Sequence, residues 1–113
     1  MNIITKETSG VTVIELKGSV LGGPDATALN DVIHKIVEKK KKKNIIVDLS
    51  GVQSMNSSGL TMLIGALTTI RNAGGEMKIA APSKKIESIL VITKLATVFE
   101  IHPTVRKAIS SFT

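Results

Sequence analysis

The residues best suited to chemistry are two neighbouring serines, Ser57 and Ser58, within the segment Met55-Asn56-Ser57-Ser58-Gly59-Leu60. An apolar segment before them predicts a buried strand over residues 44–49, and apolar residues at helical spacing after them predict a helix. Those helical residues are Leu60, Leu63, Ile64, Leu67 and Ile70. A serine at the start of a helix can cap its free N–H groups. It can also carry a phosphoryl group, which the same N–H groups and the helix dipole stabilise.

The two serines lack the partners of a catalytic nucleophile. Such a serine needs a nearby base, ordinarily a histidine oriented by a carboxylate. The sequence contains only His34 and His102, which the expected elements place away from Ser57, with His34 on the solvent side of its helix. The chain has no cysteine, no metal-ligand spacing and no phosphate loop of the Gly-x-Gly-x-x-Gly or Walker type. We therefore expect a protein without catalytic activity, metal or cofactor.

Strands and helices alternate along the chain, and the serines lie between an expected strand and the helix that follows it. Gly18 is expected to end the second strand, and Pro24 to begin the first helix. The alternation predicts one α/β domain over residues 1–113, with a mixed, mostly parallel sheet of four to five strands flanked by about four helices. The expected strands cover residues 3–7, 11–16, 44–49, 76–80 and 98–100. The expected helices begin at Pro24, near Ser57, at Pro82-Ser83 and after Pro103.

Two loops are expected at the same edge of this sheet. Functional loops of open parallel sheets lie at the carboxyl ends of the strands. The loop over residues 18–24 and the loop before Ser57 both follow such ends. Both are rich in glycine or serine, so few large side chains would obstruct a partner.

The net charge of +6 raises the possibility of an anionic partner. Five consecutive lysines at positions 39–43 close the expected first helix, where cations interact favourably with its C-terminal carbonyls. They form either a solvated helix end or a binding site for nucleic acid, acidic protein or lipid headgroups. No aromatic residue interleaves with them to stack on bases, so we expect no direct nucleic-acid binding. No apolar run suggests a membrane span or signal peptide, and the absence of cysteine suits the cytoplasm.

The segment from Val47 to Leu60 resembles the STAS family, and more narrowly the anti-sigma-factor antagonists of bacteria. The opening strands and the Asn-Ala-Gly-Gly-Glu exit of the second helix, residues 72–76, extend the likeness. The resemblance implies a cytoplasmic regulator of transcription whose unphosphorylated form binds an anti-sigma factor that is also a serine kinase, and so releases the sigma factor. Phosphorylation of the motif serine, which maps to Ser57, ends this binding, and a serine phosphatase restores it.

The resemblance also implies a binding surface, with two departures from the family pattern. Its expected members are Leu21, Gly22, Asn56, Ser57, Ser58 and Gly59, with Ser58 in a structural role. Asn56 stands where the family usually has aspartate, and Leu21 stands near the place of another family aspartate. These departures favour an alternative function. In it, the chain is an unphosphorylated STAS scaffold or ligand-binding module of another signalling or transport assembly.

Overall fold

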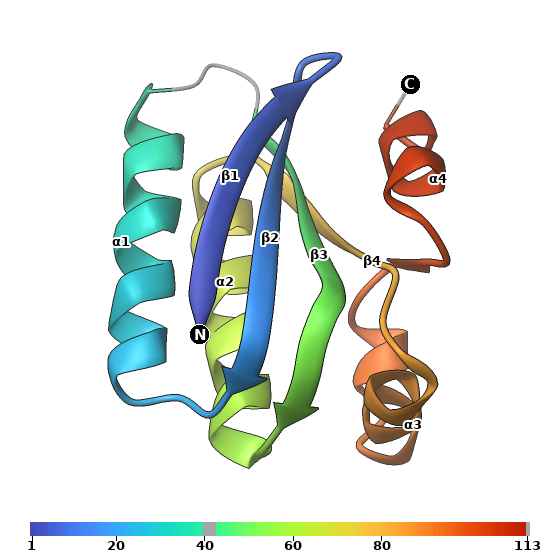
Figure 1. The fold of residues 1–113 in the computed structure, drawn as a ribbon. Helices are drawn as coiled ribbons and strands as arrows, with labels where there is room; N and C mark the ends of the chain where they lie inside the picture. The colour runs from blue at the N-terminus through green and yellow to red at the C-terminus, as the bar shows by residue number, and fades with distance from the viewer. Residues whose placement is uncertain (40–42, 113) are drawn as a thin grey trace.

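A five-stranded mixed sheet forms the centre of the fold (Figure 1). The computed structural model describes residues 1–39 and 43–112. The strands follow the order β1-β2-β3-β4-β5; β1 and β2 form an antiparallel hairpin, and every other neighbouring pair is parallel. The predicted mixed, mostly parallel sheet is therefore confirmed. The strand bounds are β1 (Asn2–Thr8), β2 (Val11–Val20), β3 (Asn44–Met55), β4 (Glu76–Ala80) and β5 (Ile101–His102).

Helices cover both faces of this sheet. Figure 1 shows α1 and α2 on one side and α4 on the other. The described helices are α1 (Pro24–Lys39), α2 (Ser57–Asn72), α3 (Lys84–Ile92) and α4 (Val105–Ser110), with a 3₁₀ turn, η1 (Leu95–Thr97). Pro24 begins α1 as predicted. No helix in the described part of the chain is long and apolar enough to cross a membrane.

Two apolar clusters hold these layers together. Neighbouring residues of a strand point to opposite faces, so Ile45 and Val47 join the cluster under α1 and α2, whereas Ile46 joins the cluster under α4. Leu63 and Leu67 bring the predicted apolar face of α2 into the first cluster. The second cluster is smaller and consists of Val11, Val13, Ile46, Ala80 and Ala108. The helix containing Ser57 is thus fixed to the larger core.

Both β2 and β3 are longer than predicted. Gly18 does not end β2, because the strand passes through it as a bulge, with φ +91°, and continues to Val20. β3 continues beyond Leu49 to Met55. The ladder between β2 and β3 shifts register between Glu15 and Lys17 and again between Gly18 and Ser19, which is how a bulge accommodates an extra residue. The serines therefore follow a long strand directly rather than a loop after residue 49.

The predicted last strand over residues 98–100 is also wrong. β5 begins at Ile101, and Phe99 belongs to the turn that follows η1, since its N–H donates to the carbonyl of Leu95. Phe99 is buried in the larger core all the same. An apolar residue at position 99 thus fills the core from a turn, which a strand pattern in the sequence does not distinguish from a strand.

The projecting end of β3 lies beside α3. β4 ends at Ala80, which pairs with Asp48, so the residues of β3 after Asp48 have no partner in β4. α3 follows β4 and contacts β3. A helix beside an unpaired strand edge protects it from pairing with another chain.

A lysine on β4 anchors the C-terminal segment. Lys78 is buried, and its Nζ donates to the backbone carbonyl (3.1 Å) and the hydroxyl (2.7 Å) of Ser111. The same Nζ lies 2.7 Å from Glu100 Oε2 and 4.2 Å from the centroid of the Phe112 ring. These contacts hold α4 over the second cluster.

The carboxyl of Glu100 should have an unusually low pKa. Hydrogen bonds with His102 and Lys78 lower its pKa from the ordinary 4.5 to about 2. Because the folded pKa lies below the unfolded one, its stabilising contribution is complete above about pH 4.5 and is lost as pH falls towards 2. The side chain is 54% exposed, so Glu100→Gln should cost less than about 1 kcal/mol at pH 7 in urea unfolding. An NMR midpoint near 4.5 for this carboxyl would contradict the assignment.

Candidate functional site

Asn56, rather than a serine, caps α2. Its backbone is extended, with φ −107° and ψ −177°, and its Oδ1 accepts a hydrogen bond of 2.8 Å from the N–H of Gly59. Ser57 is the first helical residue, so the serine cap that the sequence allowed is not formed. The sequence held a usable signal, because asparagine is as good an N-cap as serine and stands one position earlier.

The hydroxyl of Ser57 is consequently available for other chemistry. Ser57 is exposed, and its backbone carbonyl accepts a hydrogen bond of 3.0 Å from Thr61 Oγ1. Within residues 1–39 and 43–112, its side chain has no hydrogen-bond partner. The first turn of α2 contains no acidic residue, so nothing there offsets the positive end of the helix dipole. An anion attached to Ser57 would be favoured by this environment.

The first turn of α2 packs tightly on the end of β2. The N–H of Asn56 donates to the carbonyl of Val20 at 3.4 Å. A Cβ added to Gly59 would lie 2.1 Å from the same oxygen, which no side chain can tolerate. Glycine at this position thus lets the helix approach β2 closely, and this approach fixes the position of Ser57.

The loop after β2 meets the start of α2, as predicted. Gly22 is buried with φ +81°, and a Cβ added to it would lie 2.6 Å from the Cβ of Ser58. Leu21, one residue before, is 49% exposed, and its N–H donates to Asp25 Oδ2 at 3.3 Å. Gly22 and Ser58 are therefore in close contact, and the structural role expected for Ser58 stays a prediction. We call Leu21, Gly22, Asn56, Ser57, Ser58 and Gly59 the Ser57 face.

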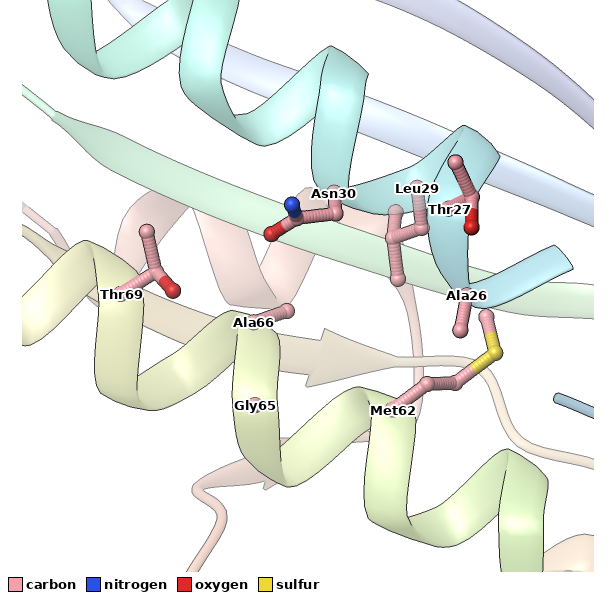
Figure 2. A pocket seen from close by; sticks show the side chains of 8 residues that line it. All are labelled: Ala26, Thr27, Leu29, Asn30, Met62, Gly65, Ala66 and Thr69. Carbon is pink, nitrogen blue, oxygen red and sulfur yellow. The ribbon is translucent and has the colours of Figure 1, made fainter. Parts of the chain in front are cut away.

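An uncharged surface continues from the Ser57 face along α2. Residues 57–70 include no charged side chain, and the exposed members are small, such as Thr61, Gly65 and Thr68. A groove of about 350 Å³ lies between α1 and α2. Met62 and Ala66 of α2 face α1 in this groove (Figure 2). Charged residues are depleted in the centres of protein interfaces. The surface therefore has the composition of a protein-binding site.

Other sequence-predicted features lie away from this face. His34 is exposed on α1, as predicted. His102 is the last residue of β5, and its Nε2 lies 2.8 Å from Glu100 Oε2. Of the lysine run, Lys40, Lys41 and Lys42 lie outside the described residues. Lys43 Nζ donates to the carbonyl of Ala73 at 2.9 Å. No group of three potential metal ligands occurs among the residues that the structure describes.

Two substitutions of Asn56 should distinguish the stabilising effect of the cap hydrogen bond from the effect of a negative charge at this position. Asn56→Ala removes the acceptor for the Gly59 N–H and should cost about 1 kcal/mol of folding free energy. Asn56→Asp keeps the acceptor and adds a negative charge near the helix N-terminus, which should gain about 0.3–1 kcal/mol. Urea unfolding at pH 7 measures both changes. Equal stability of the alanine variant and the wild type would show that this bond contributes nothing.

A model of the STAS domain family matches residues 2–108. The chain belongs to the STAS family. The resemblance read from residues 47–60 is therefore confirmed, whereas the limits of the STAS domain at residues 1 and 113 stay a prediction.

Relatives of this STAS chain carry the name anti-sigma factor antagonist. A Thermotoga maritima protein named as a candidate anti-sigma factor antagonist is 30% identical over 69 residues, or 61% of each chain. A Paenibacillus polymyxa protein named anti-sigma F factor antagonist is 24% identical over 93 residues, covering 82% of this chain and 79% of the relative. The match thus spans about three fifths of the Thermotoga relative.

A solved structure shares the STAS fold. The crystal structure of a candidate anti-sigma factor antagonist from Thermotoga maritima superposes with a TM-score of 0.84 at 24% identity. The superposition covers 96% of this chain and 92% of that one. At this level of identity the likeness concerns the fold alone, so function has to be argued from the Ser57 face.

Proposed function

We propose that the chain is a bacterial anti-sigma-factor antagonist whose binding is switched by phosphorylation of Ser57. The observation that carries this proposal is the exposed Ser57 hydroxyl, which is not used for capping and lies at the N-terminus of a 16-residue helix. The names of the relatives support the class of partner. The chain has no catalytic activity of its own and works in the cytoplasm.

In the unphosphorylated state, the Ser57 face binds an anti-sigma factor that is also a serine kinase. Leu21 supplies an exposed apolar side chain, and Asn56, Ser57 and Ser58 supply small polar surface around it. The buried Gly22 and Gly59 shape the backbone beneath. Binding occupies the anti-sigma factor and so releases the sigma factor, without contact between this chain and nucleic acid or membrane.

Phosphorylation changes the face rather than the fold. A phosphoserine carries about −1.5 to −2 charges at neutral pH, and a helix N-terminus favours such a charge by about 0.3–1 kcal/mol. α2 therefore stays folded. A partner surface that matched an uncharged face must now desolvate a dianion, which weakens the complex. A serine phosphatase restores the binding form.

Phosphorylation with matched serine variants tests this proposal. The chain is incubated with ATP and an anti-sigma-factor serine kinase from the same genome, and its intact mass is measured. We expect the wild type and Ser58→Ala to gain one phosphoryl group and Ser57→Ala to gain none. Ser58→Ala is a matched control, since it keeps the Cβ that contacts Gly22.

Two results would contradict the proposal. Modification of Ser57→Ala to the same extent as the wild type would place the phosphoryl group elsewhere. An unmodified wild type, with a kinase that phosphorylates a related antagonist, would favour the unphosphorylated scaffold instead. Asn56 and Leu21 are the residues that favour this second candidate.

A further inference from the structure

α3 presents two apolar side chains to solvent. Ile92 is 80% exposed and Val91 is 59% exposed, which makes them the most exposed large apolar side chains in the described part of the chain. The opposite side of the helix is already in the core, because Ile86 and Leu90 are fully buried. α3 therefore cannot bury Val91 and Ile92 by rotating about its axis.

Hydrogen bonds fix both ends of this helix. At its start, Ser83 Oγ accepts a hydrogen bond of 3.3 Å from the N–H of Ile86. At its end, Thr93 Oγ1 donates to the carbonyl of Ile89 at 2.7 Å. The exposed pair therefore stands on a rigid element, so a partner loses little conformational entropy of α3 on binding.

The outer side of α3 carries a shallow, open surface depression of about 450 Å³. The residues that line it are Lys84, Glu87, Ser88, Val91 and Ile92. Their spacing of three and four residues is that of one helical face. A partner helix can pack against such a face when its own apolar side chains follow the same spacing. We call these five residues the α3 ridge.

The charges around the ridge are predominantly positive. Lys84 and Lys85 begin the helix and Lys94 follows it, whereas Glu87 is its only acidic residue. Lys84, Lys85 and Lys94 form no ion pair with any other described residue. We propose that the α3 ridge docks an amphipathic helix of a partner protein that carries carboxylates on both sides of its apolar residues. This docking surface shares no residue with the Ser57 face.

Charge and composition argue against two other occupants. In a pair of identical helices, the lysines at the two ends of α3 would meet lysines of the second copy in either orientation, which disfavours self-association. A helix that binds a membrane surface needs a broad apolar face. Most of the apolar face of α3, including Ile86 and Leu90, is already buried in the core. An acidic protein segment is therefore the occupant that these residues fit.

Titration with two synthetic helical peptides tests the proposal. Both carry leucines at i, i+3, i+4 and i+7; one is flanked by glutamates and the other by lysines. Amide NMR of the ¹⁵N-labelled full chain should show saturable shifts confined to residues 84–94 with the glutamate peptide. Binding of the lysine peptide should be at least about tenfold weaker, because its charges repel those of the ridge.

Variants assign the binding to the ridge. Ile92→Ser should weaken binding of the glutamate peptide at least about tenfold, because it removes the most exposed large apolar side chain of the described residues. Ile4→Ser is a similar change at an exposed isoleucine on β1, and it should alter the affinity for the glutamate peptide by less than about twofold. Ser57→Asp should also leave it within about twofold, so failure of the Ser57 switch and failure of this proposal are distinguishable.

Several outcomes would overturn the proposal. Equal affinity for the two peptides would show that the ridge does not select its partner by charge. An unchanged affinity of Ile92→Ser for the glutamate peptide would show that the peptide does not bind at the ridge. A dimer in sedimentation velocity that Ile92→Ser abolishes would assign the ridge to a second copy. Binding to anionic phosphatidylserine vesicles that the same variant abolishes would assign it to a membrane.

Discussion

Replacing Gly59 with alanine should destabilise the protein by about 3 kcal/mol or more. The added Cβ would lie 2.1 Å from the carbonyl oxygen of Val20, 2.9 Å from its carbonyl carbon and 3.0 Å from Met55 Cγ. Two of these atoms belong to the backbone of a buried strand, so they cannot rotate away. Relief requires α2 to move off β2, which breaks the bond between Asn56 N–H and Val20. Urea unfolding measures the loss.

Gly65→Ala is the matched control on the same helix. A Cβ added to Gly65 meets no atom within 4 Å beyond its chain neighbours and the backbone of its own helix, and the residue is exposed in the middle of α2. Alanine there should stabilise the protein by about 0.5–1 kcal/mol, because it lowers the backbone entropy of the unfolded chain. Similar changes for the two variants would show that the contact between Gly59 and Val20 does not constrain the fold.

The larger elements could be predicted because their signals are local. Apolar residues at helical spacing identified α2, and Leu63 and Leu67 are buried as that spacing requires. Pro24 identified the start of α1, since its fixed φ and missing N–H suit the first helical position. The meeting of the loop at Gly22 with the start of α2 followed from the rule that loops gather at the carboxyl ends of parallel strands.

Features that depend on contacts between distant residues could not be predicted. Gly18 was expected to end a strand, whereas pairing with β3 carries β2 through it as a bulge. The need for glycine at position 59 comes from the carbonyl of Val20, which is remote in sequence. Within the site, the sequence suggested a serine as the possible cap of α2, whereas Asn56 caps it. A cap at Asn56 leaves Ser57 free, which strengthens the physical case for modification there.

Ser57→Asp should weaken binding to the anti-sigma factor at least about thirtyfold while leaving the fold intact. The carboxylate places a negative charge on an exposed position of an uncharged face, and the partner must desolvate it on binding. We expect a loss of about 2 kcal/mol or more, equivalent to about thirtyfold in affinity. Isothermal titration calorimetry with the purified anti-sigma factor measures this change. Ser57→Ala, which removes the hydroxyl without adding charge, should stay within about twofold.

Stability measurements on the same variants separate a switch from damage to the fold. Because the first turn of α2 contains no acidic residue, the aspartate should gain about 0.3–1 kcal/mol of folding free energy from the helix dipole. Weaker binding by a variant that is at least as stable as the wild type can arise only at the interface. Affinity of Ser57→Asp within about twofold of the wild type would contradict the switch, because charge at Ser57 would then not control the complex. Equal losses for Ser57→Asp and Ser57→Ala would instead assign the effect to the hydroxyl, and the negative charge of a phosphate would not be the reason for release.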